Sequence, residues 1–430
     1  MKVLNFKDKN FMQDLKELAN VSIDNKEISQ VVSDIIANVK AKGDAALFEY
    51  AEKFDKASLN ANNIAVSKEE IAIALKEVST ADKKYIKEAI ANVKLFHKHT
   101  MPKKWRAKNG HGAIIGENFY PIERVGLYIP GGQVPLVSSV VMTAVLAKQA
   151  GCPEICVCTP VSSDNKVNSH LLTALALLGI DEIYKIGGAQ AIAAMSLGTE
   201  SVKAVDKLFG PGNAFVIEAK RQMFGVVGCD LLPGPSEVLV LADSTAKAKF
   251  IAADLLSQAE HGSGKEKIFF VTTSKALVAK VLKEVERQAK LLSRREKLEK
   301  IIDIATYIIH CTNMTDAALV ANYISPEHME FHVDKKHLPF LEKNVKTAGA
   351  MLIGDYTPTV LGDFTAGPSH TLPTGRTGRF SSGLQAIDFM RRSSYVKYDE
   401  KSAKKAMEVV DAFARMEKLD AHGNSLKLRA

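Results

Sequence analysis

The sequence predicts an α/β protein of two lobes, each with a parallel sheet, and with helical arms at both ends of the chain. Between residues 125 and 235, strand-like runs such as EICVCTPV alternate with helical runs such as NSHLLTALALLGI. Residues 236–380 repeat this alternation, beginning with SEVLVLAD. Strands that alternate with helices over such a length indicate parallel sheets covered by helices on both faces.

The same patterns predict where the lobes and arms begin and end. Residues 1–27 are expected to form an N-terminal arm with its own short helix. Residues 28–124, which begin with long helical patterns and end in turns and short strands, are assigned to a first lobe together with residues 236–382. Residues 125–235 form the second lobe, and residues 383–430 form a C-terminal arm. The two arms are expected to clasp a partner subunit.

Composition favours a protein that acts on a small molecule in the cytoplasm. The 430 residues are 46% hydrophobic and 25% charged, and the net charge of +8 is spread along the chain, which favours an anionic small ligand over nucleic acid. No signal peptide and no membrane-spanning apolar run is visible. The five cysteines are odd in number and indicate reduced thiols: Cys152, Cys156, Cys158, Cys229 and Cys311. CPEICVC resembles a buried strand rather than a zinc knuckle.

Glycine turns follow several of the predicted strands. The segments YIPGGQ, KIGGAQ, FGPGN and LPGPSE each follow a strand-like run. Such turns allow backbone N–H groups to approach a phosphate or nucleotide closely, although each alone is commonly a structural joint. None has the Gly-x-Gly-x-x-Gly spacing of a dinucleotide fingerprint. Their clustering favours a ligand at the strand ends.

The segment SQAEHG ends a predicted helix over residues 245–261. On a helical wheel, Gln258 and His261 fall together at one edge of the apolar arc, whereas Glu260 points nearly opposite. Gln258 and His261 are therefore placed to converge on one ion or ligand. The alternative is a histidine at a helix end that is satisfied by nearby carbonyl groups.

The segment SPEHMEFH places a glutamate beside a histidine. Glu327 and His328 follow Pro326 and are expected in a turn or at a helix end, where the pair suits two separate proton transfers. The spacing of His328 and His332 is similar to that of a zincin. Met329 stands where a zincin requires glutamate, so this interpretation is discarded.

Two further segments contain unusual polar residues. Residues 362–384 are rich in Gly, Pro and Thr, which predicts a long functional loop that carries Asp363 and His370. In the C-terminal helix over 399–419, Glu417 continues an apolar stripe formed by Ala403, Met407, Val410 and Ala414. His422 follows in the tail. The alternative for Glu417 and His422 is a frayed, solvated helix end.

These segments, taken together, resemble the histidinol dehydrogenase family. The resemblance rests on YIPGG, GGAQAI, FGPGN, GPSE, SQAEHG, PEHME, GDFTAGPSH with LPTG, and AHGN, which agree in order and spacing. It implies two incomplete Rossmann-like lobes of the aldehyde-dehydrogenase kind. The first lobe would hold the metal and catalytic residues and the second NAD, and the C-terminal arm would form a homodimer with an active site shared between subunits.

The resemblance also implies a role for each candidate residue. One zinc ion per subunit would be bound by Gln258, His261, Asp363 and His422. Glu327 and His328 would be the acid–base pair, and Tyr128, Gln190 and Asn213 would bind NAD. The side chains around the substrate would be Ser236, Gln258, His261, His328, Asp363, His370, Glu417 and His422. The chain departs from the family pattern at Ser369, Arg376, Gly378 and Gly383, none of which is an expected ligand.

The activity implied is the oxidation of L-histidinol to L-histidine through L-histidinal, by two successive NAD-dependent hydride transfers at the zinc site. His328 would take the hydroxyl proton, and Glu327 would activate water for the second oxidation. A zinc hydrolase would leave the glycine turns unexplained. A nucleotide-binding regulator without chemistry would be expected to lack one of these ligands or bases.

Overall fold

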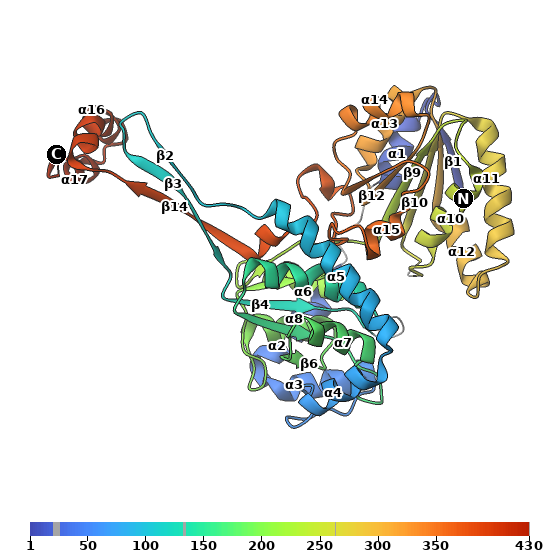
Figure 1. The fold of residues 1–430 in the computed structure, drawn as a ribbon, viewed down its shortest axis with the longest axis horizontal. Helices are drawn as coiled ribbons and strands as arrows, with labels where there is room; N and C mark the ends of the chain where they lie inside the picture. The colour runs from blue at the N-terminus through green and yellow to red at the C-terminus, as the bar shows by residue number, and fades with distance from the viewer. Residues whose placement is uncertain (20–25, 132–134, 263, 430) are drawn as a thin grey trace.

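The computed structural model describes residues 1–19, 26–131, 135–262 and 264–429. It contains two parallel sheets, each covered by helices, and a thin arm that projects from one of them (Figure 1). The predicted fold class, a two-lobed α/β protein with parallel sheets, is confirmed.

The first lobe is built on a six-stranded sheet in the order β1-β11-β10-β9-β12-β13, in which every pair is parallel. Its strands are β1 (Lys2–Asn5), β9 (Glu237–Ala242), β10 (Lys267–Thr272), β11 (Thr306–His310), β12 (His328–His332) and β13 (Ala350–Ile353). One face packs on α10 (Ala248–Ala259), α11 (Lys275–Ala289) and α12 (Arg295–Ala305). The other packs on α1 (Phe11–Ala19), α13 (Met314–Ile324) and α14 (Leu338–Asn344).

The second lobe is built on a five-stranded parallel sheet in the order β6-β5-β4-β7-β8. Its strands are β4 (Arg124–Tyr128), β5 (Glu154–Cys158), β6 (Ile183–Tyr184), β7 (Lys207–Phe209) and β8 (Gly228–Cys229). One face packs on α4 (Lys68–Glu77), α5 (Thr80–Thr100), α6 (Val137–Ala150) and α7 (Ser169–Leu177). The other packs on α2 (Lys26–Lys42), α3 (Asp44–Tyr50), α8 (Gly188–Leu197) and α9 (Ala214–Met223). A π-helical turn, η1 (Ala51–Asp55), follows α3.

Both sheets have the Rossmann strand order, shortened by one strand. Numbered along the chain from β4 or from β9, the strands lie in the order 3-2-1-4-5. A complete Rossmann sheet continues with a sixth strand beyond the fifth. In the first lobe, β1 instead adds at the opposite edge, beside β11.

The predicted grouping of residues 28–124 with residues 236–382 is wrong. The helices between residues 26 and 100 cover the five-stranded sheet: α2 packs on α8 and α9, α4 on α7, and α5 on α6. A parallel sheet must be covered on both faces, and a helical segment that precedes the lobes in sequence can cover either sheet. The interpretation of residues 1–27 as an arm also needs correction, because β1 and α1 belong to the first lobe. Residues 20–25 lie outside the described part.

The projecting arm is formed by two distant parts of the chain (Figure 1). β3 (Ile114–Pro121) pairs antiparallel with β14 (Met390–Lys397) along its whole length, and β2 (Trp105–Lys108) pairs with the other side of β3. The strands lead to α16 (Glu400–Glu417) and α17 (Asp420–Lys427) at the far end. The remaining short helices are η2 (Lys335–His337), α15 (Thr359–Phe364), η3 (Thr377–Arg379) and η4 (Ala386–Phe389).

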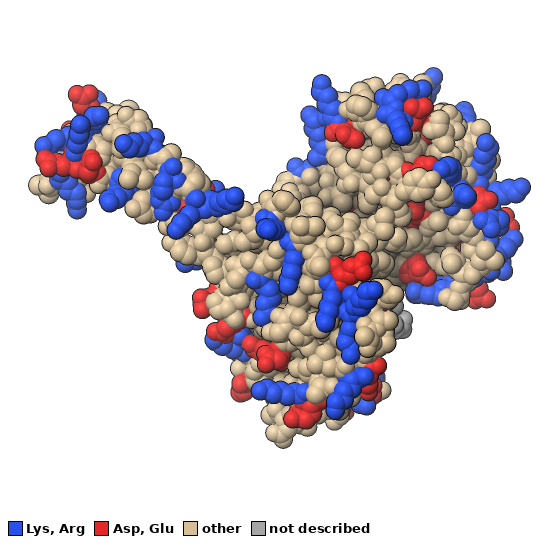
Figure 2. Space-filling view, viewed as in Figure 1, with Lys and Arg blue, Asp and Glu red and all other residues tan. Residues whose placement is uncertain are grey.

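Charge is scattered over the visible face of the molecule. Figure 2 shows lysine and arginine side chains on both lobes and on the arm, interspersed with acidic side chains. Within the described residues, no helix combines the length and apolar character needed to cross a bilayer.

Candidate active site between the lobes

The acid–base pair lies at the amino end of the six-stranded sheet. Glu327 lies in the bend between α13 and β12, in keeping with the predicted turn, whereas His328 is the first residue of β12 rather than part of a turn or helix end. The Ser236 hydroxyl, just before β9, donates a 2.7 Å hydrogen bond to the Glu327 carboxyl, and the backbone N–H of Glu237 donates another of 2.9 Å. Burial raises the pKa of Glu327 to about 8, although these two hydrogen bonds oppose the shift.

His328 is buried beside two carboxyl groups. Its Nε2 atom lies 3.8 Å from Glu327 Oε1 and 3.9 Å from Asp363 Oδ1. Burial, and then the proximity of His370 and His261, lower the pKa of His328 to about 3. The imidazole is therefore neutral near pH 7, and a neutral imidazole has a free nitrogen that can accept a proton.

The end of α10 places Gln258 and His261 toward the same region. Gln258 is buried, and its side-chain nitrogen has no hydrogen-bond partner. His261 follows the helix C-cap Glu260, and Gly262 then reverses the chain with a positive φ of 77°. Surrounding protein groups partly exclude water from the His261 ring and lower its pKa, although the residue is exposed in the single chain, and Glu266 and Glu260 partly offset the shift. The His261 ring is close enough to lower the pKa of both His328 and His370.

Asp363 and His370 flank a segment that bridges the two lobes. Asp363 was predicted in a long loop but belongs to the short helix α15. Burial raises its pKa to about 7. His370 is in the loop itself; burial lowers its pKa to about 4, and its Nε2 has no hydrogen-bond partner. The neighbouring Ser369 hydroxyl donates to the carbonyl of Met142 in α6, which fixes this loop to the second lobe.

Glu417 and His422 are far from these residues within one chain. Glu417 ends α16 and His422 lies in α17, at the far end of the arm from α10 and α15 (Figure 1). Both side chains are exposed, although Glu417 continues a stripe whose members Ala403 and Ala414 are buried. The seven remaining substrate and acid–base positions lie around one region, whereas the two arm positions are exposed to solvent.

The expected NAD residues lie at the carboxyl end of the five-stranded sheet. Tyr128 ends β4, and its hydroxyl accepts a 3.1 Å hydrogen bond from the Gly188 N–H at the start of α8, where Gln190 is buried. Asn213 caps α9 by accepting hydrogen bonds from the N–H groups of Phe215 and Val216. β4 and β7 are the strands at which the order reverses, which is where such folds bind ligands.

The turns around these residues are tightly packed. Gly210 adopts a φ of 112° against the Tyr128 carbonyl oxygen, where a Cβ atom would not fit. The Lys220 ammonium and the Asp230 carboxylate form a buried ion pair, and they bond the Gly210 carbonyl oxygen and N–H respectively. Gly132 and Gln133 of the YIPGGQ turn lie outside the described residues.

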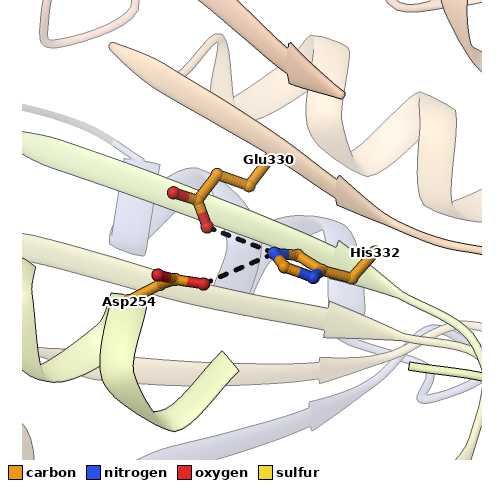
Figure 3. A group of neighbouring side chains, drawn as sticks. All are labelled: Asp254, Glu330 and His332. Atoms are coloured by element: carbon orange, nitrogen blue, oxygen red, sulfur yellow. Dashed lines mark ion pairs between the residues drawn. The ribbon is translucent and has the colours of Figure 1, made fainter. Parts of the chain in front are cut away.

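Sequence reasoning missed two features. One is a cavity of about 320 Å³ beyond β5, lined by residues that include Thr159, Pro160 and Asn168. The other is a buried group of Asp254, Glu330 and His332, whose carboxylate and imidazole atoms lie within 4.8 Å of one another (Figure 3). The alternation of polar and apolar residues in HMEFH was the available signal for a strand with a polar face.

Comparison with known proteins identifies the family. Residues 18–430 match the family model described as histidinol dehydrogenase. The chain is 43% identical to the histidinol dehydrogenase of Lactococcus lactis over 94% of its own length and 93% of that protein. It is also 43% identical to the histidinol dehydrogenase of Clostridium acetobutylicum, over 97% of its own length and 96% of that protein. The crystal structure of histidinol dehydrogenase from Elizabethkingia anophelis superposes with a TM-score of 0.94 at 33% identity, covering 100% of this chain and 98% of that one. The chain therefore belongs to the histidinol dehydrogenase family, a family of NAD-dependent oxidoreductases of histidine biosynthesis.

Proposed function

We propose that the chain oxidises L-histidinol to L-histidine through L-histidinal, with two successive hydride transfers to NAD at a zinc site. The observation that carries the proposal is the approach of Glu327, His328 and Asp363 within a region that His261 and His370 also reach. This region belongs to a chain that matches the family over nearly its whole length.

The residues present fit a zinc ion. Gln258, His261 and Asp363, with His422 of the partner subunit, would supply two imidazole nitrogens and two oxygens, a donor set that zinc accepts. Gln258 is buried and its amide nitrogen has no hydrogen-bond partner, so no such bond prevents the amide from turning its oxygen, the group that can bind zinc, toward an ion. When bound, zinc would hold the imidazole and amino nitrogens of histidinol and fix the reacting carbon in place.

The acid–base roles follow from the environments of the two side chains. The neutral His328 imidazole would accept the hydroxyl proton of the alcohol, because burial keeps its ring nitrogen unprotonated near pH 7. Glu327, held by Ser236 and the Glu237 N–H, would take a proton from water during the second oxidation in its ionised form, which becomes the major form above about pH 8. Ser236 and His370 of the same chain, together with Glu417 of the partner subunit, would contact the substrate and orient it.

NAD would bind across the carboxyl end of the five-stranded sheet, where Tyr128, Gln190 and Asn213 lie. The N-terminus of α8, which has no side-chain cap, presents backbone N–H groups there, which favours a phosphate. The expected NAD residues thus lie at the carboxyl end of the five-stranded sheet, and the acid–base residues lie at the amino end of the six-stranded sheet. A cofactor held by the second lobe would therefore meet a substrate held by the first.

We also propose a homodimer in which each arm completes the site of the other subunit. The end of the arm exposes an apolar stripe on α16, where Val409, Phe413 and Met416 are 49%, 55% and 62% exposed. An exposed stripe of this kind supports a protein contact. The arm also carries Glu417 and His422 away from the site of its own chain. The expected cytoplasmic location agrees with five free cysteines.

NADH formation from histidinol by the purified zinc-loaded dimer tests the proposal. We expect two NADH per histidinol consumed, loss of activity after chelation, and recovery when zinc is restored. Consumption of histidinol without NADH, or activity that is indifferent to complete metal removal, would contradict it.

A further inference from the structure

The strand that begins with His328 carries a row of polar side chains into the interior. His328, Glu330 and His332 alternate with Met329 and Phe331, so the three polar residues share one face of β12. Their register partners on β9 are Val238, Val240 and Ala242, which belong to the apolar cluster under α10. Beyond the acid–base residue, therefore, two ionisable side chains are buried against a helix in an otherwise apolar layer.

Helix α10 carries a matching row. Asp254 and Gln258 are four residues apart, and His261 follows three residues later, so all three lie on one side of the helix. Asp254 Oδ2 lies 3.4 Å from His332 Nε2, whereas His261 lies near His328. The span from His328 to His332 is about 13 Å along a strand. That from Asp254 to His261 is about 10 Å along a helix. The two rows thus contact each other at the His332 end, and at the other end, in the candidate active site, His261 lies close enough to His328 to lower its pKa.

A third element joins the same cluster through Glu330. Glu330 Oε2 lies 3.5 Å from His332 Nε2, and its other oxygen accepts hydrogen bonds of 2.7 Å from both the N–H and the hydroxyl of Thr359. Thr359 begins α15, and Asp363 lies one turn later in that helix. The contact between Glu330 and Thr359 therefore fixes the helix that carries a predicted zinc ligand.

The cluster is held together by charge (Figure 3). His332 and Glu330 are 1% and 0% exposed, and neither His332 nitrogen makes a well-aligned hydrogen bond. Burial alone would lower the pKa of His332, but the contacts with Asp254 and Glu330 outweigh it and raise the pKa to about 9. Asp355, on the segment before α15, lies 3.5 Å from the other ring nitrogen of His332 and 2.9 Å from Lys247 at the start of α10.

We propose that His332, with Asp254 and Glu330, forms a positioning cluster that sets the spacing of α10, β12 and α15, and so the approach of Gln258, His261 and Asp363 to His328. None of the three cluster residues would touch substrate or zinc. The inference rests on the proposed function for its consequence in catalysis, but the spacing of the three elements is a separate property.

The test compares His332→Gln with Val320→Ala, a cavity-forming change of a buried residue on the opposite face of the same sheet. Zinc dissociation constants of the metal-free dimers are measured by competition with a chromogenic chelator, alongside melting temperatures and steady-state kinetics. Because groups behind a metal ligand typically tune affinity 10–100-fold, we expect His332→Gln to weaken zinc binding by about that factor. We expect kcat to fall in parallel, with an unchanged KM for NAD.

Two further variants keep the test decisive. Asp254→Asn, on a helix near the surface, replaces His332→Gln if the latter does not fold. Glu330→Gln removes the charge but keeps an oxygen that can accept the hydrogen bonds from Thr359. We expect it to weaken zinc binding less than His332→Gln does. Val320→Ala should lower the melting temperature while leaving zinc affinity and kcat within about twofold, since it touches none of the three elements' polar contacts.

Three outcomes would overturn the proposal. Zinc affinity in His332→Gln that matches Val320→Ala would remove the positioning role. A second zinc per subunit in the wild-type protein, lost in His332→Gln, would make the cluster a cation site instead. A fall in kcat with unchanged zinc affinity would place its effect elsewhere. A wild-type protein that binds zinc but does not oxidise histidinol would refute the proposed function alone.

Discussion

The Ser236 hydroxyl donates a 2.7 Å hydrogen bond to the carboxyl group of Glu327, which joins the start of β9 to the start of β12. With the backbone N–H of Glu237 on the same oxygen, it holds one side of the carboxyl and leaves the other toward His328. A glutamine in place of Glu327 would keep an oxygen that accepts both hydrogen bonds, but it would have no carboxylate oxygen with which to accept a proton.

Glu327→Gln is therefore expected to spare aldehyde formation more than aldehyde oxidation. Loss of a general base typically costs about 10²–10⁴-fold, and we expect that loss in the second half-reaction. Single-turnover rates from histidinol and from histidinal measure the two halves separately. Equal losses in both halves would contradict the assigned role.

His328→Asn is expected to slow both half-reactions, with the loss of alcohol oxidation reaching about 10²-fold or more. The reason is that the ring, which burial keeps unprotonated, is the group that we propose accepts the alcohol proton. His170→Asn is the control, because its ring is half-exposed on the other lobe. Alcohol oxidation at the wild-type rate in His328→Asn would remove His328 from the mechanism.

Mixed dimers test whether the arm of one subunit serves the other. His422→Asn damages only the arm, and His328→Asn damages only the body of the first lobe. If the site is shared, a dimer with one subunit of each kind contains one intact site. After unfolding and refolding together, the mixture should regain about a quarter of wild-type activity, since about half of random dimers are mixed. A mixture as inactive as its parents would place His422 in its own subunit's site, and a fully active His422→Asn dimer would place it outside any site.

Lys220→Met is expected to destabilise the second lobe strongly. Lys220 is fully buried and pairs with Asp230, and it also donates to the carbonyl oxygens of Gly210 and Leu231. Removing one partner of a buried ion pair leaves the other charge unpaired, which costs about 3–5 kcal/mol. Lys203→Met is the matched control, because its pair with Glu154 is exposed and should be worth at most about 1 kcal/mol. Urea unfolding measures both; similar losses would show that burial of Lys220 is unimportant.

His97 is expected to make the protein sensitive to mild acid. Its side chain is buried in α5, and burial lowers its pKa from 6.5 to about 4. The unfolded chain binds the proton more readily, so stability falls as the pH drops from about 6.5 to 4, by up to about 3 kcal/mol from this residue. His97→Gln removes the titration and should flatten that part of the stability curve. Parallel wild-type and variant curves would show that His97 does not contribute.

Local patterns in the sequence were sufficient to predict the two sheets but not how helices are shared between them. Alternating strands and helices identify both parallel sheets, because each unit follows the previous one along the chain. Residues 28–100 were assigned to the wrong lobe, because the apolar face of α2, including Val32 and Ile35, specifies burial but not a partner. β1 was missed since a four-residue edge strand leaves little pattern.

The candidate site shows the same division. Short motifs located Glu327, His328 and Asp363, and the structure places these three near one another. The Asp254–Glu330–His332 cluster was missed because its members come from α10 and β12, which are brought together only by the tertiary fold. His422 was assigned by resemblance, and a single chain leaves it in solvent.

Pairing of β3 with β14 joins residues 114–121 to residues 390–397, near the end of the chain. During synthesis, one side of β3 must therefore wait unpaired while more than half of the protein is made. An open strand edge is a template for wrong pairing with other chains. The strand pairing of the arm is thus completed only after the residues of both lobes have been synthesised, and a chain shortened before residue 390 would leave one edge of β3 open.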